Sequence, residues 1–243
     1  MGDTAVILAG GRGSRLAPYT TVLPKPLLPV GDRPILDIVL RQLHAAGFED
    51  VVIAVGHLAH LVEALLGDGN QYGLRIRYHT EREPLGTAGP LSGIEGLADT
   101  FLMMNGDVLT DLDYRDLITA HRAAGNTLTI ATHERAIATD YGILHVDGTR
   151  GATRAVAGYE EKPTFRYRVS MGVYALEPGA IEHIPQNASF DLPDLVLALL
   201  AANHPVGSYD FDGYWLDIGR HDDYERAARD ADVVLPRLLG RLD

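Results

Sequence analysis

A glycine-rich loop directly after a short apolar strand constrains this chain more than any other feature. Residues 5–8 are Ala-Val-Ile-Leu, and Gly10, Gly11 and Gly13 follow closely. Glycine has no Cβ, so the backbone can turn sharply and approach a ligand. Successive bare N–H groups in such a loop can bind an anion, and Arg15 adds a guanidinium group that matches phosphate oxygens. The stretch predicts a phosphate-binding loop at the end of a buried strand.

Two common phosphate-binding loops are excluded by the residues that follow. A Walker A loop ends in Gly-Lys-Ser/Thr, and a dinucleotide fingerprint needs glycine where this chain has Leu16. Further along, Pro24-Lys25-Pro26 holds one lysine between two prolines whose φ angles are fixed. The alternative is a glycine-rich turn with solvated arginines. The loop, Arg15 and the Pro-Lys-Pro segment together disfavour that interpretation.

Lysine is rare in this chain. Nineteen of the 21 cationic residues are arginine, and the two lysines, Lys25 and Lys162, both precede a proline. A compact ammonium group on a flexible stem is not interchangeable with a planar guanidinium group. We infer that both lysines occupy positions where an ammonium group is required. Chance placement in a chain of biased composition is the alternative.

Hydrophobic periodicity predicts alternating strands and helices in the first half. The expected strands cover 5–8, 51–55, 74–79 and 101–104, and the expected helices cover 34–47, 58–66, 86–97 and 112–124. Such alternation is typical of a mainly parallel sheet covered on both faces. After residue 127 the pattern changes to strands over 127–132, 142–146, 153–160 and 169–174. We expect an α/β fold: a doubly wound, mainly parallel (Rossmann-like) mixed sheet with an antiparallel extension in the second half.

The last part of the chain returns to mixed elements. We expect a helix over 191–202, strands over 206–211 and 213–216, and a helix over 221–231. A tail from residue 233 would pack on the domain or on a second subunit. The chain has 243 residues and no break in composition, so we expect one domain over 1–243.

Composition excludes several classes of protein. There is no cysteine, which excludes disulfides and thiolate metal sites. The formal net charge of −12 argues against general nucleic-acid binding, which requires a basic face. No apolar run approaches the roughly 20 residues needed to cross a bilayer, and no signal segment precedes the first strand. We expect a cytoplasmic protein that binds neither nucleic acid nor membranes.

Residues 8–26 closely resemble the signature of the sugar-phosphate nucleotidylyltransferases, also called nucleotide-sugar pyrophosphorylases, which here is Leu8-Ala9-Gly10-Gly11-x-Gly13-x-Arg15-Leu16 followed by Pro24-Lys25-Pro26. The resemblance continues through later motifs to about Tyr224. It implies transfer of a nucleoside monophosphate from a nucleoside triphosphate to a sugar 1-phosphate, with Mg²⁺ as cofactor and pyrophosphate as product. It also implies a nucleotide-binding half over 1–125, a sugar-phosphate-binding half over 126–232, a tail over 233–243, and a homo-oligomer, with a dimer favoured.

The resemblance assigns roles to individual residues. Those implied to bind the nucleotide are Leu8, Gly10, Gly11, Gly13, Ser14, Arg15, Glu81, Gly86 and Thr87. Those implied to bind the sugar phosphate are Asn105, Gly142, Glu161, Lys162 and Met171. The implied catalytic cations are Arg15, Lys25 and Lys162. At Met171, relatives often have a small residue before the glycine, so the sugar pocket of this chain is expected to differ.

Two aspartates are implied to hold the metal. Asp107 lies just beyond a predicted strand, at the carboxyl edge where doubly wound sheets carry their sites. Asp217 shares a strand face with Trp215 by alternation. Mg²⁺ is usually held by one or two carboxylates together with substrate phosphates. The alternative for Asp107 is a turn or helix-cap aspartate, an interpretation that suits Asp111 and Asp113 better.

Glu81 bears on which base is bound, because residues 81–89 align with the base-recognition loop of the family. An ionised carboxylate only accepts hydrogen bonds. Guanine offers two adjacent donors, whereas thymine and uracil offer one donor flanked by acceptors, so Glu81 favours GTP. One alternative is that Glu81 is solvated and the backbone of Gly86 or Thr87 contacts the base. Another is that the enzyme is a thymidylyl-, uridylyl- or cytidylyltransferase. A catalytically inactive subunit that binds a nucleotide sugar is a further alternative.

Overall fold

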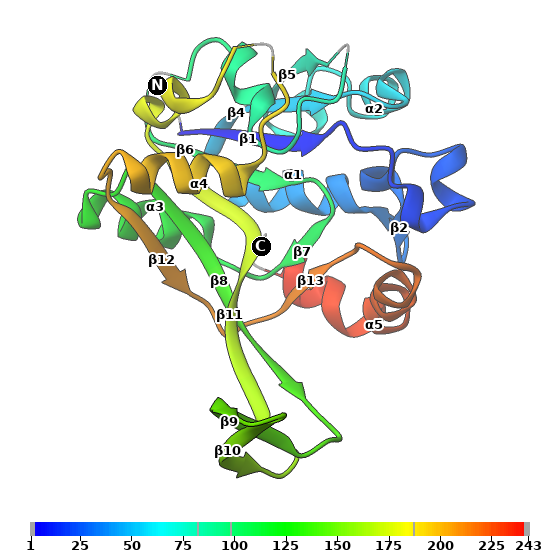
Figure 1. Ribbon diagram of the computed structural model, residues 1–243. Helices are drawn as coiled ribbons and strands as arrows, with labels where there is room; N and C mark the ends of the chain where they lie inside the picture. Colours follow the sequence, from blue (N-terminus) through cyan, green and yellow to red (C-terminus); the bar gives the residue numbers. More distant parts are fainter. Residues whose placement is uncertain (1–2, 82, 98, 187, 241–243) are drawn as a thin grey trace.

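The computed structural model describes residues 3–81, 83–97, 99–186 and 188–240. Its centre is a seven-stranded sheet with the strand order β12-β8-β11-β6-β1-β4-β5 (Figure 1). Its strands are β1 (Asp3–Ala9), β4 (Phe48–Val55), β5 (Arg75–Thr80), β6 (Phe101–Asn105), β8 (Leu128–Ala138), β11 (Thr164–Leu176) and β12 (Val206–Asp210). All neighbours pair in parallel except β11, which is antiparallel to both β6 and β8. The predicted mixed, mainly parallel sheet is confirmed.

Helices cover both faces of this sheet. They are α1 (Ile35–Ala45), α2 (Ala59–Leu66), α3 (Tyr114–Ala124), α4 (Leu192–Ala201) and α5 (His221–Leu239). Neighbouring residues of a strand point to opposite faces, so Ile7 packs in one apolar cluster with side chains of α1, α2, α3 and α5. Val6 packs in a second cluster with side chains of α4. Burial on both faces explains why the inner parallel strands β1, β4 and β6 contain continuous apolar runs.

The helix predicted over 86–97 is wrong. Within the described part of this segment only Gly89–Gly93 forms a single 3₁₀ turn. The backbone N–H groups of Ala88 and Gly89 both donate to the Phe190 carbonyl at 2.9 Å. Gly86 has φ 80°, which an α-helix does not contain. The backbone of this segment is hydrogen-bonded to the distant loop at Phe190. Its glycines and Pro90 also lower the helix propensity of the segment.

Helix α5 is longer than the predicted helix over 221–231 and includes most of the expected tail. Ala227, Ala231, Val234 and Leu238 are all buried, and their spacing continues one helical stripe. This stripe packs against α1, where the Gln42 side-chain amide donates to the Leu238 carbonyl at 3.3 Å. Residues 233–240 therefore pack on the domain itself, and residues 241–243 lie outside the described part of the chain.

Two small antiparallel pairs lie beside the main sheet. One is β2 (Pro29–Val30) with β3 (Arg33–Pro34). The other is β7 (Val108–Thr110) with β13 (Trp215–Asp217). Strand β7 was not predicted, and β13 lies slightly later than the predicted strand over 213–216. No described helix is both long and apolar enough to span a membrane.

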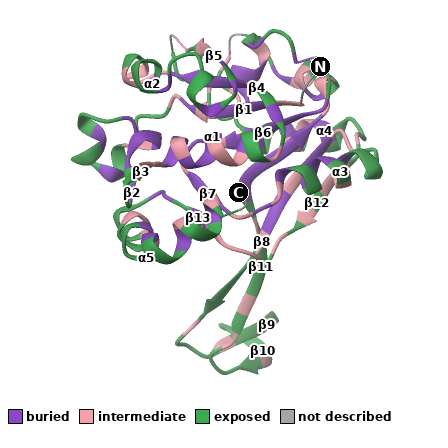
Figure 2. Ribbon diagram, turned by 180° about the vertical axis from the view of Figure 1, so that it is seen from behind, coloured by how far each residue is buried: buried purple, intermediate pink, exposed green. Residues whose placement is uncertain are grey.

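A two-stranded ribbon projects from the body of the molecule (Figures 1 and 2). It is formed by the outer parts of β8 and β11, and β9 (Ile143–Arg150) and β10 (Thr153–Glu160) form a hairpin at its end. We call residues 133–170 the arm. All of them are described, and none has a buried side chain. The predicted antiparallel extension is confirmed, and β8 and β11 are longer than predicted.

Candidate active site

The loops after the parallel strands meet at one edge of the sheet, as expected for strands that end on the same side. Gly10 follows β1, Gly56 follows β4 and Glu81 follows β5. The His57 N–H donates to the Gly10 carbonyl at 3.2 Å. A Cβ on Gly56 would lie 2.8 Å from that carbonyl oxygen, and a Cβ on Gly10 would lie 2.6 Å from Oε1 of Glu81. Gly10, Gly56 and Glu81 therefore pack against one another, and this packing leaves no room for a side chain at Gly10 or Gly56.

Gly56 offers a test of this packing. We expect Gly56→Ala to displace the Gly10 loop, because its methyl group would meet backbone rather than a movable side chain. A displacement of this kind should raise the KM for the predicted nucleotide substrate by about tenfold or more. Gly179→Ala is the control, since a Cβ there has open space around it. Equal KM values for both variants and the wild type would contradict a role of this packing.

The glycine-rich loop folds back on the segment that carries Lys25. Gly13 has φ 60°, and its carbonyl accepts a hydrogen bond from the Thr20 hydroxyl at 2.8 Å. Leu16 is buried and anchors the 3₁₀ turn Ser14–Leu16. Gly11, Ser14 and Arg15 are exposed. The loop is therefore fixed at Gly13 and Leu16, while Gly11, Ser14 and Arg15 are accessible to a ligand.

Two carboxylates far apart in the sequence meet beside this loop. Asp107 directly precedes β7, and Val108 pairs with Asp217 of β13. The Ile218 N–H donates to the Asp107 carbonyl at 3.1 Å. The Lys25 ammonium group donates to Oδ2 of Asp107 in an ion pair. The unpredicted strand β7 is therefore what brings Asp107 and Asp217 together.

The charges around Asp217 identify it as part of the same cluster. The pKa of its carboxyl group is raised, mainly because surrounding protein displaces water and also because the Asp107 carboxylate is near. Lys25 and Arg15 act in the opposite direction on this pKa. A Cβ on Gly219 would lie 3.8 Å from both the Arg15 guanidinium and Oδ1 of Asp217. Two acidic and two cationic side chains therefore share one small region.

This pair of carboxylates fits a hard divalent cation. Oδ1 of Asp107 is buried and has no hydrogen-bond partner among the described residues. An unpaired buried carboxylate oxygen is costly unless a cation or another ligand completes it. Burial, and after it the nearby Asp107 carboxylate, raises the pKa of Asp217, so its charge is also costly without a cation. Oxygen ligands of this type are those that Mg²⁺ prefers.

The segment 81–89, which is predicted to recognise the base, lies against the glycine-rich loop at Glu81. The Leu85 N–H donates to Oε2 of Glu81 at 3.1 Å. Burial raises the pKa of the Glu81 carboxyl group, and the Leu85 N–H and His79 lower it. Thr87 instead faces the start of α4, where its N–H and hydroxyl donate to Asp191 at 2.9 and 3.2 Å. From the described part of this segment, Glu81 lies beside Gly10.

Asn105 and Met171 lie at the base of the arm, next to the carboxylates. Asn105 ends β6 and pairs with Leu8 in register. A Cβ on Gly172, which has φ 75°, would lie 2.7 Å from Nδ2 of Asn105. Met171 is buried, and its carbonyl accepts a hydrogen bond from the Trp215 indole N–H at 2.9 Å. The predicted sugar-phosphate residues Asn105 and Met171 therefore lie near the predicted metal ligands.

Trp215 received no role from the sequence. The Arg135 guanidinium lies 4.8 Å from the centre of its ring, and the His133 ring lies 5.5 Å away. The signal that points to it is its position two residues before Asp217, on the same strand face. Trp215 therefore lies between the arm and the strand that carries Asp217.

Gly142, Glu161 and Lys162 lie elsewhere, at the outer end of the arm. The Tyr159 hydroxyl donates to Oε2 of Glu161 at 2.5 Å, and a Cβ on Gly142 would collide with that hydroxyl. Lys162 is exposed, with φ 47°. Thr164, the first residue of β11, is separated from Ser170 by six residues of strand, about 20 Å. Within one chain, these three residues are not brought to the carboxylate cluster.

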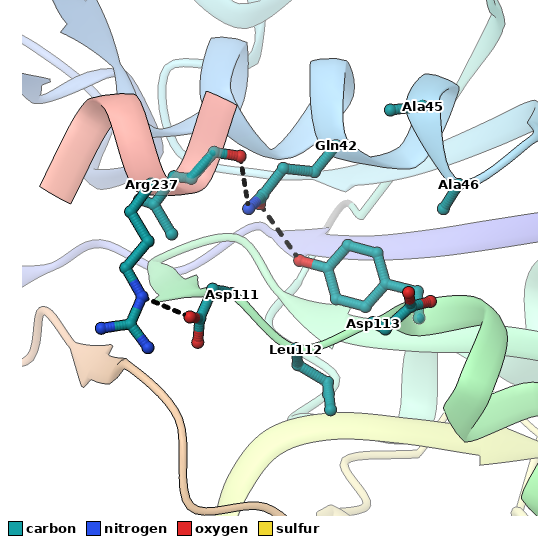
Figure 3. Close-up of a pocket in the computed structure, with 9 residues that line it drawn as sticks. Gln42, Ala45, Ala46, Asp111, Leu112, Asp113 and Arg237 are labelled. Atoms are coloured by element: carbon teal, nitrogen blue, oxygen red, sulfur yellow. Dashed lines mark hydrogen bonds and ion pairs between the residues drawn. The ribbon is translucent and has the colours of Figure 1, made fainter. Parts of the chain in front are cut away.

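A separate pocket of about 170 Å³ lies between α1, α3 and the end of α5 (Figure 3). None of the predicted site residues lines it. Asp111, which does line it, accepts hydrogen bonds from the Tyr214 N–H at 2.6 Å and from Arg237 at 2.5 Å. Asp113 caps α3 by accepting from the N–H groups of Arg115 and Asp116. Asp113 is the helix cap that was predicted, whereas Asp111 connects the segment before α3 to Tyr214 and to α5.

Comparison with known proteins shows the family of the chain. The model of the family described as "Nucleotidyl transferase" matches residues 4–232. A UTP–glucose-1-phosphate uridylyltransferase of Synechocystis is 32% identical, over 93% of this chain and 62% of its own length. A mannose-1-phosphate guanylyltransferase of Mycobacterium tuberculosis is 33% identical, over 93% of this chain and 64% of its own length. This chain thus spans about three fifths of the length of these relatives.

A solved structure of HddC from Yersinia pseudotuberculosis has a similar fold. It is 26% identical, with a TM-score of 0.71 over 95% of this chain and 99% of that chain. The family model covers nearly the whole chain, and the relatives carry the names of sugar-phosphate nucleotidylyltransferases. The chain therefore belongs to the nucleotidyl transferase family, as its resemblance to the sugar-phosphate nucleotidylyltransferases predicted.

Proposed function

We propose that this protein transfers a nucleoside monophosphate from a nucleoside triphosphate, with GTP favoured, to a sugar 1-phosphate and releases pyrophosphate. One observation carries the proposal: Lys25, Asp107, Asp217 and Arg15 converge beside an exposed glycine-rich loop. Such a group of charges suits a polyphosphate, whose charge needs neutralisation at several oxygens. The names of the relatives support a sugar 1-phosphate as the acceptor.

The proposed chemistry needs positioning and charge neutralisation rather than a general base. An oxygen of the sugar 1-phosphate attacks the α-phosphorus in line, a new oxygen–phosphorus bond forms, and the bond to the β-phosphate oxygen breaks. The nucleophile is already an anion, so no proton has to be removed. The rate enhancement then comes from holding the reactants in line and from fixed charges placed where negative charge develops.

The chain's own cations have separate tasks in this scheme. The N–H groups of Gly11 and Ser14 and the Arg15 guanidinium would hold the triphosphate, because all three residues are exposed on the loop. Lys25 is fixed between two prolines, and its ammonium group lies against Asp107. It would neutralise charge on the triphosphate as the bond to pyrophosphate breaks. Lys162 would hold the incoming phosphate group.

Asp107 and Asp217 would hold Mg²⁺. When bound, the ion would neutralise charge on the phosphate oxygens of the substrates. The Lys25–Asp107 ion pair supports this role, and so does the raised pKa of Asp217, which is caused mainly by burial and further by the nearby Asp107 carboxylate. We also propose that 1–125 forms the nucleotide-binding half and that 126–232 forms the sugar-phosphate-binding half.

GTP is favoured because Glu81 lies directly against Gly10 of the phosphate loop. A carboxylate there would accept both donors on the guanine edge. The relatives include guanylyl- and uridylyltransferases at similar identity. A complex of HddC with GMP-PN, 25% identical to this chain, lends support to a guanine nucleotide.

Glu81→Gln tests the choice of base. We expect the variant to lose preference for GTP over UTP by about tenfold or more, since one charged acceptor becomes a donor. Because burial raises the pKa of Glu81, the KM for GTP should rise as the pH falls through that pKa and the carboxyl group gains a proton. Glu83→Gln, in the same loop but exposed, is the control. An unchanged ratio of kcat/KM for GTP and UTP in the Glu81 variant would contradict the assignment.

The activity is tested by pyrophosphate release in the presence of Mg²⁺. GTP, dTTP, UTP, CTP and ATP would be crossed against hexose and heptose 1-phosphates. We expect release with GTP and one sugar phosphate. Release with a pyrimidine triphosphate alone would keep the class of reaction and reject the Glu81 argument. No release with any pair, together with a higher melting temperature in the presence of a nucleotide sugar, would favour a binding subunit without turnover.

A further inference from the structure

The backbone of residues 85–89 is held by the loop that precedes α4. The Phe190 N–H donates to the Leu85 carbonyl at 2.8 Å, and the Phe190 carbonyl accepts from the N–H groups of Ala88 and Gly89, each at 2.9 Å. Residues 85–88 belong to no helix or strand. Backbone polar groups outside regular elements need partners elsewhere, so the conformation of this segment depends on a loop about a hundred positions away.

The Asp191 side chain adds a second connection to the same segment. Its Oδ1 accepts hydrogen bonds from the N–H group of Thr87 at 2.9 Å and from the Thr87 hydroxyl at 3.2 Å. The Thr87 hydroxyl in turn accepts from the N–H group of Leu192, the first residue of α4, at 2.8 Å. The first N–H groups of a helix have no partner within the helix. Thr87 and the start of α4 therefore satisfy each other's polar groups.

An ordinary helix cap does not account for these bonds. A cap aspartate satisfies N–H groups in the first turn of its own helix, and Asp191 and Asp194 do form a capping box at the start of α4. In that box the Asp191 N–H donates to Oδ2 of Asp194 at 3.2 Å. The two bonds from Thr87 come in addition, across 104 positions of sequence. The Asp191 carboxylate thus serves segment 85–89 as well as α4.

The close approach of Gly86 shows how tightly the two stretches meet. A Cβ on Gly86 would lie 2.7 Å from Oδ1 of Asp191 and 2.7 Å from the Phe190 carbonyl oxygen. Gly86 also has φ 80°, a left-handed conformation that glycine adopts without strain. Ala88 is buried in the apolar cluster that contains side chains of α4, whereas Gly86 and Thr87 are exposed. One side of the segment is therefore anchored on the body, and the other side is accessible.

Leu85 connects this anchored segment to Glu81. Its carbonyl accepts from the Phe190 N–H at 2.8 Å, and its own N–H donates to Oε2 of Glu81 at 3.1 Å. The other carboxylate oxygen of Glu81, Oε1, lies beside Gly10. Hydrogen bonds to a donor or acceptor of a base are effective only when the protein group is held in the correct orientation. The Leu85 N–H orients the Glu81 carboxylate, and the loop before α4 orients Leu85.

We infer that Asp191 is a positioning residue for the choice of base. Through Thr87 it holds segment 85–89 in the conformation in which the Leu85 N–H directs the Glu81 carboxylate towards the nucleotide. Asp191 itself does not touch the base. The inference rests on the proposed function for the role of Glu81. It also means that a residue of the second half of the chain controls selectivity for a nucleotide that the first half binds.

Amide hydrogen exchange tests the positioning without any nucleotide. We expect the N–H groups of residues 87–89 to exchange at least about tenfold faster in Asp191→Ala than in the wild type, because the segment opens more often. Asp191→Asn keeps an acceptor oxygen and should restore most of the protection. Asp194→Ala is the matched control, since it disturbs the same helix start but keeps the Asp191 carboxylate. Unchanged exchange in Asp191→Ala, or equal loss of protection in Asp194→Ala, would overturn the inference.

Steady-state kinetics and calorimetry with GTP and UTP test the consequence for the base. In Asp191→Ala we expect the KM and Kd for GTP to rise by about tenfold, while kcat at saturation and the KM for the sugar 1-phosphate stay within about twofold of the wild type. Asp194→Ala should keep the wild-type ratio of kcat/KM for GTP and UTP.

A double variant shows whether Asp191 acts through Glu81. If it does, adding Asp191→Ala to Glu81→Gln should change the ratio for GTP and UTP no further, because residues that act through one contact are not additive. A fully additive loss, or a fall in kcat alone, would overturn the inference. A wild-type protein that binds no nucleoside triphosphate would instead reject the proposed function, and the exchange data would still decide whether Asp191 holds segment 85–89.

Discussion

Replacing Lys25 by alanine should lower kcat by at least about a hundredfold, the scale for loss of one charge contact in a transition state. Lys25 is one of only two lysines, lies between two prolines and donates to Oδ2 of Asp107. Removing its ammonium group would leave the negative charge of the leaving pyrophosphate without this neutralising contact. The measurement is steady-state pyrophosphate release at saturating concentrations of both substrates, with a thermal melt to show that the variant folds.

Lys25→Arg distinguishes charge from geometry. It keeps a positive charge but replaces a compact ammonium group by a wider, planar guanidinium group. We expect kcat to remain well below that of the wild type, in line with the retention of lysine in an arginine-rich chain. Wild-type kcat in Lys25→Ala would remove Lys25 from the mechanism. Wild-type kcat in Lys25→Arg alone would show that a positive charge at this position is sufficient.

Asp217→Asn should lower activity and raise the stability of the substrate-free protein. A neutral amide is a poor ligand for Mg²⁺ compared with a carboxylate. The loss should exceed the roughly 10- to 100-fold that removal of an outer-shell partner costs, and saturation should need more Mg²⁺. The pKa of Asp217 is raised in the folded protein, so its charge opposes folding at pH values above that pKa. The melting temperature of the variant should therefore be higher at neutral pH.

The higher melting temperature expected for Asp217→Asn should depend on pH. A proton binds Asp217 more tightly in the folded than in the unfolded chain, so the penalty disappears as the pH falls through the folded-state pKa. The difference in melting temperature between Asp217→Asn and the wild type should shrink over the same range. Asp222→Asn, an acidic residue in the first turn of α5, is the control for a general loss of negative charge. A normal Mg²⁺ titration for Asp217→Asn would remove this residue from the metal site.

The parallel half of the fold could be predicted because burial on both faces leaves continuous apolar runs in the sequence. Residues 51–55 and 101–104 are such runs, and both are strands of the central sheet. The helix over 86–97 could not be excluded in this way, because the bonds that determine its loop come from Phe190. A partner a hundred residues away leaves no local pattern.

The candidate site was predictable to different degrees. The glycine-rich loop and Lys25 are adjacent in sequence, so their chemistry could be inferred from local residues. Asp107 and Asp217 were paired by resemblance alone, because the physical link is the short strand β7 and its pairing with β13. Strands β8 and β11 are longer than the sequence predicts. Their outer residues are all partly or fully exposed, so no pattern of core-facing residues marks them.

The central claim is that the bond between the α- and β-phosphates of a nucleoside triphosphate breaks and that the α-phosphorus passes to a sugar 1-phosphate. Phosphorus NMR of the protein with Mg²⁺, GTP and a sugar 1-phosphate follows this bond directly. The account predicts that a nucleoside diphosphate sugar and free pyrophosphate accumulate in equal amounts. Formation of GDP and orthophosphate, or unchanged signals with every triphosphate and sugar phosphate tried, would contradict it.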